Sequence, residues 1–453
     1  MSTSSHLYHV RRTLVLAWPM ILSRVGLVTM SMIDVIVLGR AGAQELANYI
    51  LGQAVYDSLV GMIVGLLLGV PVLVARETGA ENPGATGTIL RRGLVLALIL
   101  GAVLWLPMQF SGYLYAFAGQ SEALVAQAGR VTAILAYGLP CIGLYYVCAA
   151  YLEALERPIP GFVAIATANV LNLVFNVILV HGWGPIPALG AVGCALATVF
   201  TFGLAALGML IYLRRDILRR RETTSIVPPM REQTQIGLAS GGAFLFEASS
   251  FAVLVLIIGQ LGALALAAHG ILFQFLALTF MIGFGIAGAT QVRVGNAWGR
   301  NDWPGMARAG WTGLVLACLG TGAMTLLLGL NREIYVALFT DDAAVAAVAL
   351  PVMIWAMLTP IFDGGQTVMN AACRGRGDTW FPTGLQFINY IVVLVPAAWL
   401  LAIPLGQGLA GVYQAIVLAS ILSVTLLGFR FHWLTRPQRS DTTSRGNHNA
   451  PGG

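Results

Sequence analysis

The chain has 453 residues, of which 58% are hydrophobic and only 10% are charged. Soluble domains carry about 25% charged residues, so the composition excludes a soluble globule and indicates a polytopic membrane protein. All 25 basic residues are arginines, lying almost wholly between apolar segments. We therefore expect the net charge of +6 to orient the chain in a lipid bilayer and not to bind nucleic acid.

Apolar runs long enough to cross a bilayer, about 20 residues each, recur along the whole chain. They predict an all-α integral membrane protein with twelve transmembrane helices. The expected spans are 13–38, 49–75, 93–115, 129–152, 161–181, 188–212, 236–258, 265–292, 308–330, 346–371, 382–403 and 409–431.

The arginines are distributed very unevenly between the two sides of these spans. With the N-terminus placed in the cytoplasm, only Arg40, Arg130 and Arg332 fall on the opposite side, and Arg24 falls inside a span. Arginine-rich loops stay cytoplasmic. The pattern therefore predicts that both termini are cytoplasmic.

The chain divides into two related halves. Residues 1–212 hold spans one to six, 213–233 form a basic cytoplasmic linker, 234–432 hold spans seven to twelve, and 433–453 form a polar tail that we expect to be disordered. Shifting 39–82 by 220 positions onto 259–302 aligns identical residues, among them Gly39 with Gly259 and Gly79 with Gly299. A parallel six-span repeat is a transporter architecture with the site between the halves.

Few ionisable side chains fall within the predicted spans. Span one contains Arg24 and Asp34, span two Asp57, span seven Glu247 and span ten Asp363. Charges at this depth are costly and usually face a protein interior or a watery cavity. Four acids against one arginine predict a net negative interior that suits protons, sodium ions or organic cations, and we expect Arg24 to act as a counter-charge or to extend toward a membrane interface.

Polar side chains at helical spacing accompany these acids. Gln366, Thr367 and Asn370 share a helix face with Asp363. Gln53 lies one turn before Asp57, and span five carries a stripe of three amides, Asn169, Asn172 and Asn176. Such stripes either line a polar cavity or link packed helices by hydrogen bonds, and both interpretations stay open. A neutral, hydrogen-bonded acid also stays open as an interpretation of each of the four acids, Asp34, Asp57, Glu247 and Asp363.

Pro19 lies within span one, 15 residues before Asp34. A proline removes one backbone hydrogen bond and permits a kink, so the helix either bends during function and moves Asp34 or carries a static bend.

The five cysteines show no metal-ligand spacing, and no P-loop, paired zinc ligands or Ser/His/Asp arrangement is present. We expect no enzyme activity and no cofactor.

Several segments, in this order, resemble the multidrug and toxic compound extrusion (MATE) transporters, closest to their NorM-type bacterial branch. They are SMIDVIVLGRAG with Asp34, GAEN, FLFEASSFAVLVLIIGQLGALALAAH with Glu247, FMIGFGIAGATQVRVGNAWGR, and FDGGQTVMNAACRGRGDTWFP with Asp363. The likeness spans roughly 10–430. It implies two pseudo-symmetric six-helix lobes in a V, in the bacterial inner membrane. It also implies export of cationic, often aromatic compounds in exchange for Na⁺ or H⁺. We expect a monomer.

The resemblance also assigns roles to residues. Glu247 and Asp363 match the acids of the cation site in the C-terminal lobe and would hold Na⁺ if sodium is the coupling ion. Asp34, Asn172, Asn176 and Thr198 match the polar cluster of the N-terminal lobe, and Pro19 matches the kinkable first helix. Asn176 stands where many relatives carry an acid, which removes one negative charge. Asp57 and Arg24 have no counterpart in the family pattern.

Two other transporter classes are the alternatives. A lipid-linked oligosaccharide flippase of the same superfamily needs a cationic cavity for a pyrophosphate, which four acids disfavour. A major-facilitator-type transporter also has twelve spans in two halves, but the basic motif expected between spans two and three is absent from ARETGAENPGATGTILRR.

Overall fold

The computed structural model describes residues 3–117, 121–218, 226–340 and 342–436. Twelve helical segments within these ranges are long and apolar enough to cross a membrane, as predicted. The described ranges contain no β-strand, only an isolated bridge between Trp183 and Ile186. The all-α fold class is therefore confirmed.

In the described ranges the N-terminal half contains nine helices, a tenth (α10) lies in the predicted linker, and two of the spans are interrupted. Span two breaks at Leu68 and span four at Ala136 and Tyr137. The helices are α1 (Thr3–Ala41), α2 (Ala43–Leu67), α3 (Gly69–Gly79), α4 (Pro83–Met108), α5 (Ser111–Phe117), α6 (Glu122–Leu135), α7 (Gly138–Ala154), α8 (Ile159–His181), α9 (Gly190–Tyr212) and α10 (Arg214–Leu218).

The C-terminal half has one unusual span, the eleventh, in which a π-helix separates two short α-helices. Such widened turns often occur at functional sites. The helices are α11 (Met230–Gln260), α12 (Ala263–Gly299), α13 (Trp303–Leu330), α14 (Arg332–Ala337), α15 (Ala343–Gly375), α16 (Trp380–Phe387), η1 (Ile388–Leu394), α17 (Val395–Ala402) and α18 (Gly408–Leu434).

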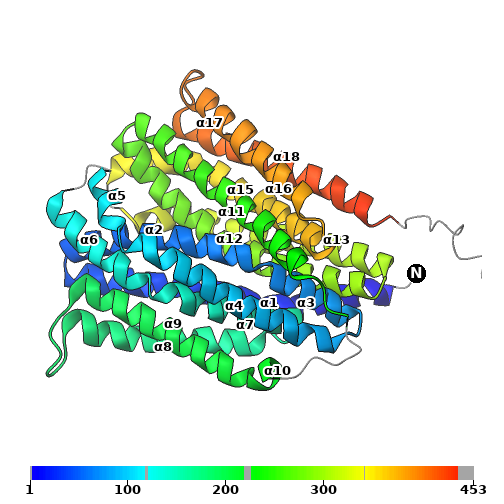
Figure 1. The fold of residues 1–453 in the computed structure, drawn as a ribbon. Helices are drawn as coiled ribbons and strands as arrows, with labels where there is room; N and C mark the ends of the chain where they lie inside the picture. Colours follow the sequence, from blue (N-terminus) through cyan, green and yellow to red (C-terminus); the bar gives the residue numbers. More distant parts are fainter. Residues whose placement is uncertain (1–2, 118–120, 219–225, 341, 437–453) are drawn as a thin grey trace, which may run out of the picture.

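The long helices lie side by side, with α8 and α9 at one edge of the molecule and α17 and α18 at the other (Figure 1). Of the predicted linker, 219–225 lie outside the described residues, and α11 already begins at Met230. The tail prediction also lies largely outside them, from residue 437 onward, while α18 continues to Leu434.

Small residues bring the two halves into close contact at one level. A Cβ added at Gly65 of α2 would lie 2.7 Å from Gly241 Cα of α11, and one at Gly285 of α12 would lie 2.8 Å from Ile21 Cα of α1. Without a hydrophobic force between helices in lipid, such close packing is a main source of helix association. These glycines therefore hold the halves together.

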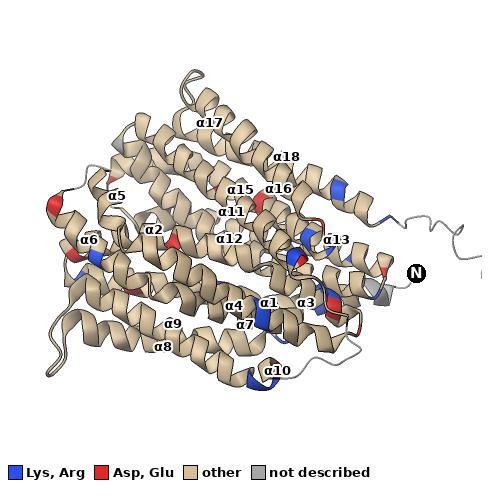
Figure 2. Ribbon diagram, viewed as in Figure 1, with Lys and Arg blue, Asp and Glu red and all other residues tan. Residues whose placement is uncertain are grey.

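Arginines gather toward the end of the molecule where the chain begins (Figure 2). There Arg76 Nη1 donates to Glu232 Oε1 of the other half at 2.6 Å, and Asn296 Nδ2 donates to Glu156 Oε1 at 2.7 Å. Arg293 also donates to the main-chain oxygen of His9 at 3.0 Å. Polar contacts thus close the arginine-rich end.

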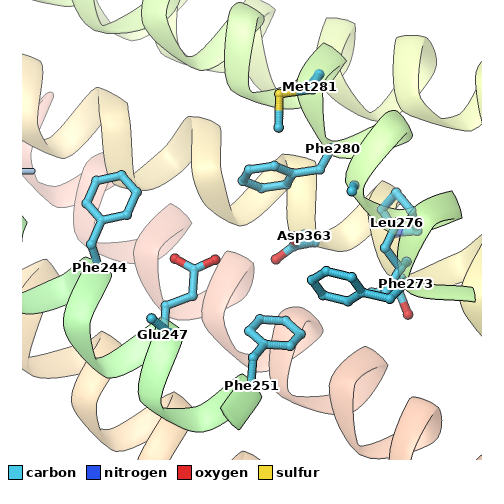
Figure 3. Close-up of a pocket in the computed structure, with 12 residues that line it drawn as sticks. Phe244, Glu247, Phe251, Phe273, Leu276, Phe280, Met281 and Asp363 are labelled. Carbon is cyan, nitrogen blue, oxygen red and sulfur yellow. The ribbon is translucent and has the colours of Figure 1, made fainter. Parts of the chain in front are cut away.

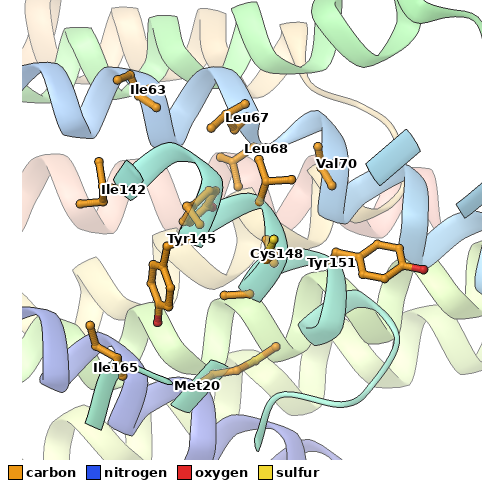
Figure 4. Close-up of a cluster of buried hydrophobic side chains, with 14 of the residues drawn as sticks. Met20, Ile63, Leu67, Leu68, Val70, Ile142, Tyr145, Cys148, Tyr151 and Ile165 are labelled. Atoms are coloured by element: carbon orange, nitrogen blue, oxygen red, sulfur yellow. The ribbon is translucent and has the colours of Figure 1, made fainter. Parts of the chain in front are cut away.

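The buried apolar side chains form two separate clusters. The larger includes Ile63, Tyr145 and Ile165 of the N-terminal half, partly shown in Figure 4, and continues into the arginine-rich end of the C-terminal half through Val292 and Val294. The smaller lies wholly in the C-terminal half and includes residues such as Leu254, Leu272 and Tyr413. The halves therefore share a core at the arginine-rich end and not at the opposite end.

Candidate cation and substrate site

An apolar cavity of about 360 Å³ lies in the C-terminal half between α11, α12 and α15. Its wall carries four phenylalanines and two acids, Phe244, Phe251, Phe273, Phe280, Glu247 and Asp363. The two carboxylates come from different helices and point toward each other among the rings (Figure 3). Cavities of this size hold drug-sized ligands, and aromatic faces attract organic cations.

Of the polar side chains predicted to share a helix face with Asp363, only Gln366 donates a hydrogen bond to its carboxylate. Gln366 Nε2 donates to Asp363 Oδ1 at 2.5 Å and to the Tyr390 hydroxyl, from η1, at 2.8 Å. Thr367 instead donates its hydroxyl to the main-chain oxygen of Asp363 at 2.8 Å. Asn370 lies further along the same helix and accepts from Arg374 Nη1 at 3.1 Å.

A smaller, polar compartment of about 30 Å³ adjoins this cavity and shares Glu247, Phe244 and Phe280 with it. This volume is enough to admit at least one water molecule. Gln366, Gln386 and Tyr390 line it, and the Oε1 atoms of both glutamines lack a hydrogen-bond partner among the described residues. These amide oxygens and the Glu247 carboxylate are ligands that a hard monovalent cation prefers.

The predicted ratio of four buried acids to one arginine is wrong. Arg293 and Arg374, which we expected in loops, are buried within α12 and α15 at 5% and 8% exposure. The helices continue past the apolar runs, so charged side chains at their ends enter the protein interior. Glu153 is a further buried acid, and its Oε2 accepts from Arg24 Nη2 at 3.0 Å.

A second polar group lies in the N-terminal half and centres on Asp34. Asp34 Oδ1 accepts from Asn176 Nδ2 at 2.7 Å, and Oδ2 accepts from the Tyr49 hydroxyl at 2.7 Å and from Thr198 Oγ1 at 3.1 Å. Asn176 Nδ2 also donates to Asn172 Oδ1 at 3.0 Å. All five side chains are buried, so the carboxylate is enclosed by donors.

Tyr49 was not among the predicted site residues, since no spacing distinguishes it from other buried aromatics. The three asparagines of span five make two different kinds of contact. Asn169 Nδ2 donates to the main-chain oxygens of Gly26 on α1 and Ile165 on α8, at 3.0 and 2.8 Å, which is a helix–helix link. Asn172 and Asn176 belong to the Asp34 group.

Asp57 joins neither group. Its side chain is exposed on α2, two turns from Gly65 on the face that meets α11. Its expected neighbour Gln53 donates to Ser31 of α1 at 3.1 Å. The remaining predicted residue, Pro19, lies inside the continuous helix α1, where its main-chain oxygen accepts from Ser23 Oγ at 2.8 Å.

Twelve spanning helices, two halves that meet at one end and a cavity carrying two acids define a polytopic membrane protein of the transporter class. The profile of the MatE family matches residues 19–178 and 239–400, two segments whose starts are 220 residues apart. That offset equals the one in the predicted internal repeat. The chain belongs to the MatE family, the MATE transporters, which excludes the major-facilitator alternative.

Known proteins similar to this chain agree with the family. A protein of Caulobacter vibrioides named "Probable multidrug resistance protein NorM" is 40% identical, with 92% of this chain and 90% of that protein covered. One of the same name from Mesorhizobium japonicum is 32% identical, with 94% of each covered. A structure described as "Outward-facing conformation of a multidrug resistance MATE family transporter of the MOP superfamily" has a TM-score of 0.85 at 20% identity, covering 94% of this chain and 96% of that one.

Proposed function

We propose that the chain is a multidrug efflux antiporter that exports cationic, flat organic compounds in exchange for Na⁺ or H⁺. The observation that carries this is the pair of carboxylates, Glu247 and Asp363, facing each other in an aromatic cavity of about 360 Å³. The names of the relatives support multidrug efflux. An acid pair in an apolar wall requires a cation or a proton, because uncompensated charges at this depth are costly.

Sidedness follows from the arginines. If the arginine-rich end is cytoplasmic, both termini are cytoplasmic and this conformation is closed toward the cytoplasm. We then expect the cavity to open toward the outside, the end at which the halves share no core. We assign the chain to the inner membrane of a bacterium, as a monomer that acts without a cofactor and without catalysing a covalent reaction.

Coupling arises from competition for the same carboxylates. In the outward-open state Glu247 and Asp363 take up the coupling cation, with amide oxygens of the polar compartment as further ligands. In the inward-open state they release it and bind the exported cation. A ligand shifts such an equilibrium only by its difference in affinity for the two states, so one shared site links both fluxes.

The Asp34 group serves the conformational change in this proposal. Its hydrogen bonds tie α1 to α2, α8 and α9. Protonation or ion binding at Asp34 would remove acceptors from these bonds and free α1, where Pro19 permits a bend. Asp57, exposed near the junction of the halves, is placed to contact the exported cation as it moves along the N-terminal wall.

A flippase for lipid-linked oligosaccharides fits this interior less well. Its pyrophosphate substrate needs a cationic cavity, whereas the aromatic cavity between α11, α12 and α15 carries Glu247 and Asp363 and no basic side chain among its lining residues. The adjoining compartment adds only Arg374. The balance of charge thus favours cations as cargo.

The test is transport by the purified chain in liposomes, with a sodium gradient and a pH gradient imposed separately. Ethidium serves as the fluorescent cation. Glu247→Gln and Asp363→Asn should abolish gradient-driven efflux, while Glu333→Gln, at an exposed acid on α14, should leave it unchanged. Full efflux by both site variants, reconstituted at equal amounts, would refute the site.

A further inference from the structure

Arg374 is a buried cation without a carboxylate partner. No carboxylate oxygen lies within 4.0 Å of its guanidinium nitrogens in the described ranges, unlike Arg24, Arg76 and Arg430, which all form ion pairs. Its Nη1 donates to Asn370 Oδ1 at 3.1 Å and its Nε to Gln291 Oε1 at 3.3 Å. Neutral amides hold the group in place without neutralising its charge.

The polar compartment brings this arginine to the cation site. Arg374 and Glu247 both line it, and Glu247 also lines the aromatic cavity with Asp363. An arginine does not deprotonate in a protein. Its positive charge is therefore a permanent part of the site, whatever the two acids bind.

The other ionisable groups nearby leave this balance unchanged. Arg24 and Glu153 neutralise each other as a buried pair, with Arg24 Nη2 3.0 Å from Glu153 Oε2. Asp34 belongs to the N-terminal group, where Tyr49 and two other side chains donate to it. Two acids and one arginine thus remain at the site.

We propose that Arg374 is the fixed counter-charge of the site and makes it select singly charged over doubly charged organic cations. This inference rests on the proposed function. With both acids ionised the site has a net charge of −1, which one monovalent cation neutralises. A second positive charge would leave an uncompensated charge in a low-dielectric interior, which is costly.

Ethidium and propidium test the inference, because the two dyes share a phenanthridinium ring system and differ by one positive charge. Their binding to the purified full-length chain in nanodiscs is measured by fluorescence titration. Wild type should prefer ethidium. Arg374→Gln should strengthen the binding of propidium relative to that of ethidium by about tenfold, equivalent to about 1.4 kcal/mol. Arg374→Lys keeps the charge and should keep the wild-type ratio.

A second variant gives the site the same net charge as Arg374→Gln but keeps the arginine. Asn370→Asp places a carboxylate next to Arg374, whose Nη1 is 3.1 Å from the amide oxygen, and should shift the ratio in the same direction. If Arg374→Gln does not fold, this variant decides. An unchanged ratio in Asn370→Asp, or a shift in Arg374→Lys equal to that in Arg374→Gln, would overturn the inference.

Glu247→Gln separates this inference from the proposed function. If that variant binds both dyes like wild type, the acid pair is not the cation site and the proposed function fails. If it weakens both dyes but Asn370→Asp leaves their ratio unchanged, the acid pair stands and only the role of Arg374 is refuted.

Discussion

The buried pair of Arg24 and Glu153 gives the sharpest stability prediction. Arg24 Nη2 lies 3.3 and 3.0 Å from the two carboxylate oxygens, and both side chains are buried. Glu153→Gln removes the negative charge and leaves the guanidinium unpaired between the rings of Tyr146 and Phe284. Breaking such a pair typically costs about 3–5 kcal/mol.

A double-mutant cycle measures this cost. Unfolding of the purified chain in detergent is followed by tryptophan fluorescence for wild type, Glu153→Leu, Arg24→Met and the double variant Arg24→Met/Glu153→Leu, with Glu153→Gln measured alongside. Each single variant should lose about 3–5 kcal/mol, whereas the double variant should lose far less, because replacing both partners by apolar groups is often neutral. Losses below about 1 kcal/mol in both single variants would contradict the assignment of a buried pair.

Two further predictions concern helix packing and the Asp34 group. Gly65→Ala should lose about 1–3 kcal/mol of stability and slow ethidium efflux, because its Cβ would lie 2.7 Å from Gly241 Cα. Gly61→Ala, one turn away with no atom within 4 Å of the new Cβ, is the matched control, and equal effects of the two would refute the packing argument. Tyr49→Phe removes one donor from Asp34 and should cost about 1.5–3 kcal/mol, the value for hydrogen bonds to charged groups. If Tyr49→Phe has the same free energy of unfolding as wild type, the hydrogen bond to Asp34 does not stabilise the fold.

The number of spans, and the presence of Glu247 and Asp363 among the few acids within them, were accessible from the sequence because they depend on local information. An apolar run reveals a span by its length, and an acid within it stands out as costly. Spacing also placed Gln366 next to Asp363 correctly. What periodicity cannot supply is the partner on another helix, so Arg24 was identified as a counter-charge while its partner Glu153 was not.

Arg374 was missed for a different physical reason. Hydropathy ends a span where apolar residues end, but α15 continues to Gly375 and carries Arg374 into the interior. Tyr49 gave no signal at all, since a buried tyrosine resembles any other core aromatic until its hydroxyl is placed 2.7 Å from Asp34. Charge balance in the site therefore depends on helix ends and cross-helix contacts, which only the structure supplies.

The two polar groups differ in their readiness to receive a cation. Asp34 already accepts three hydrogen bonds. Asn176 supplies one of them, at the position where the resemblance leads one to expect an acid. A cation binding there must displace donors worth about 1.5–3 kcal/mol each. Asp363 accepts a side-chain bond from Gln366 only, and no basic side chain in the described ranges pairs with Glu247. If the chain couples to a cation as proposed, we expect the cation to enter the C-terminal site first in this conformation, and the N-terminal group to respond only after α1 moves.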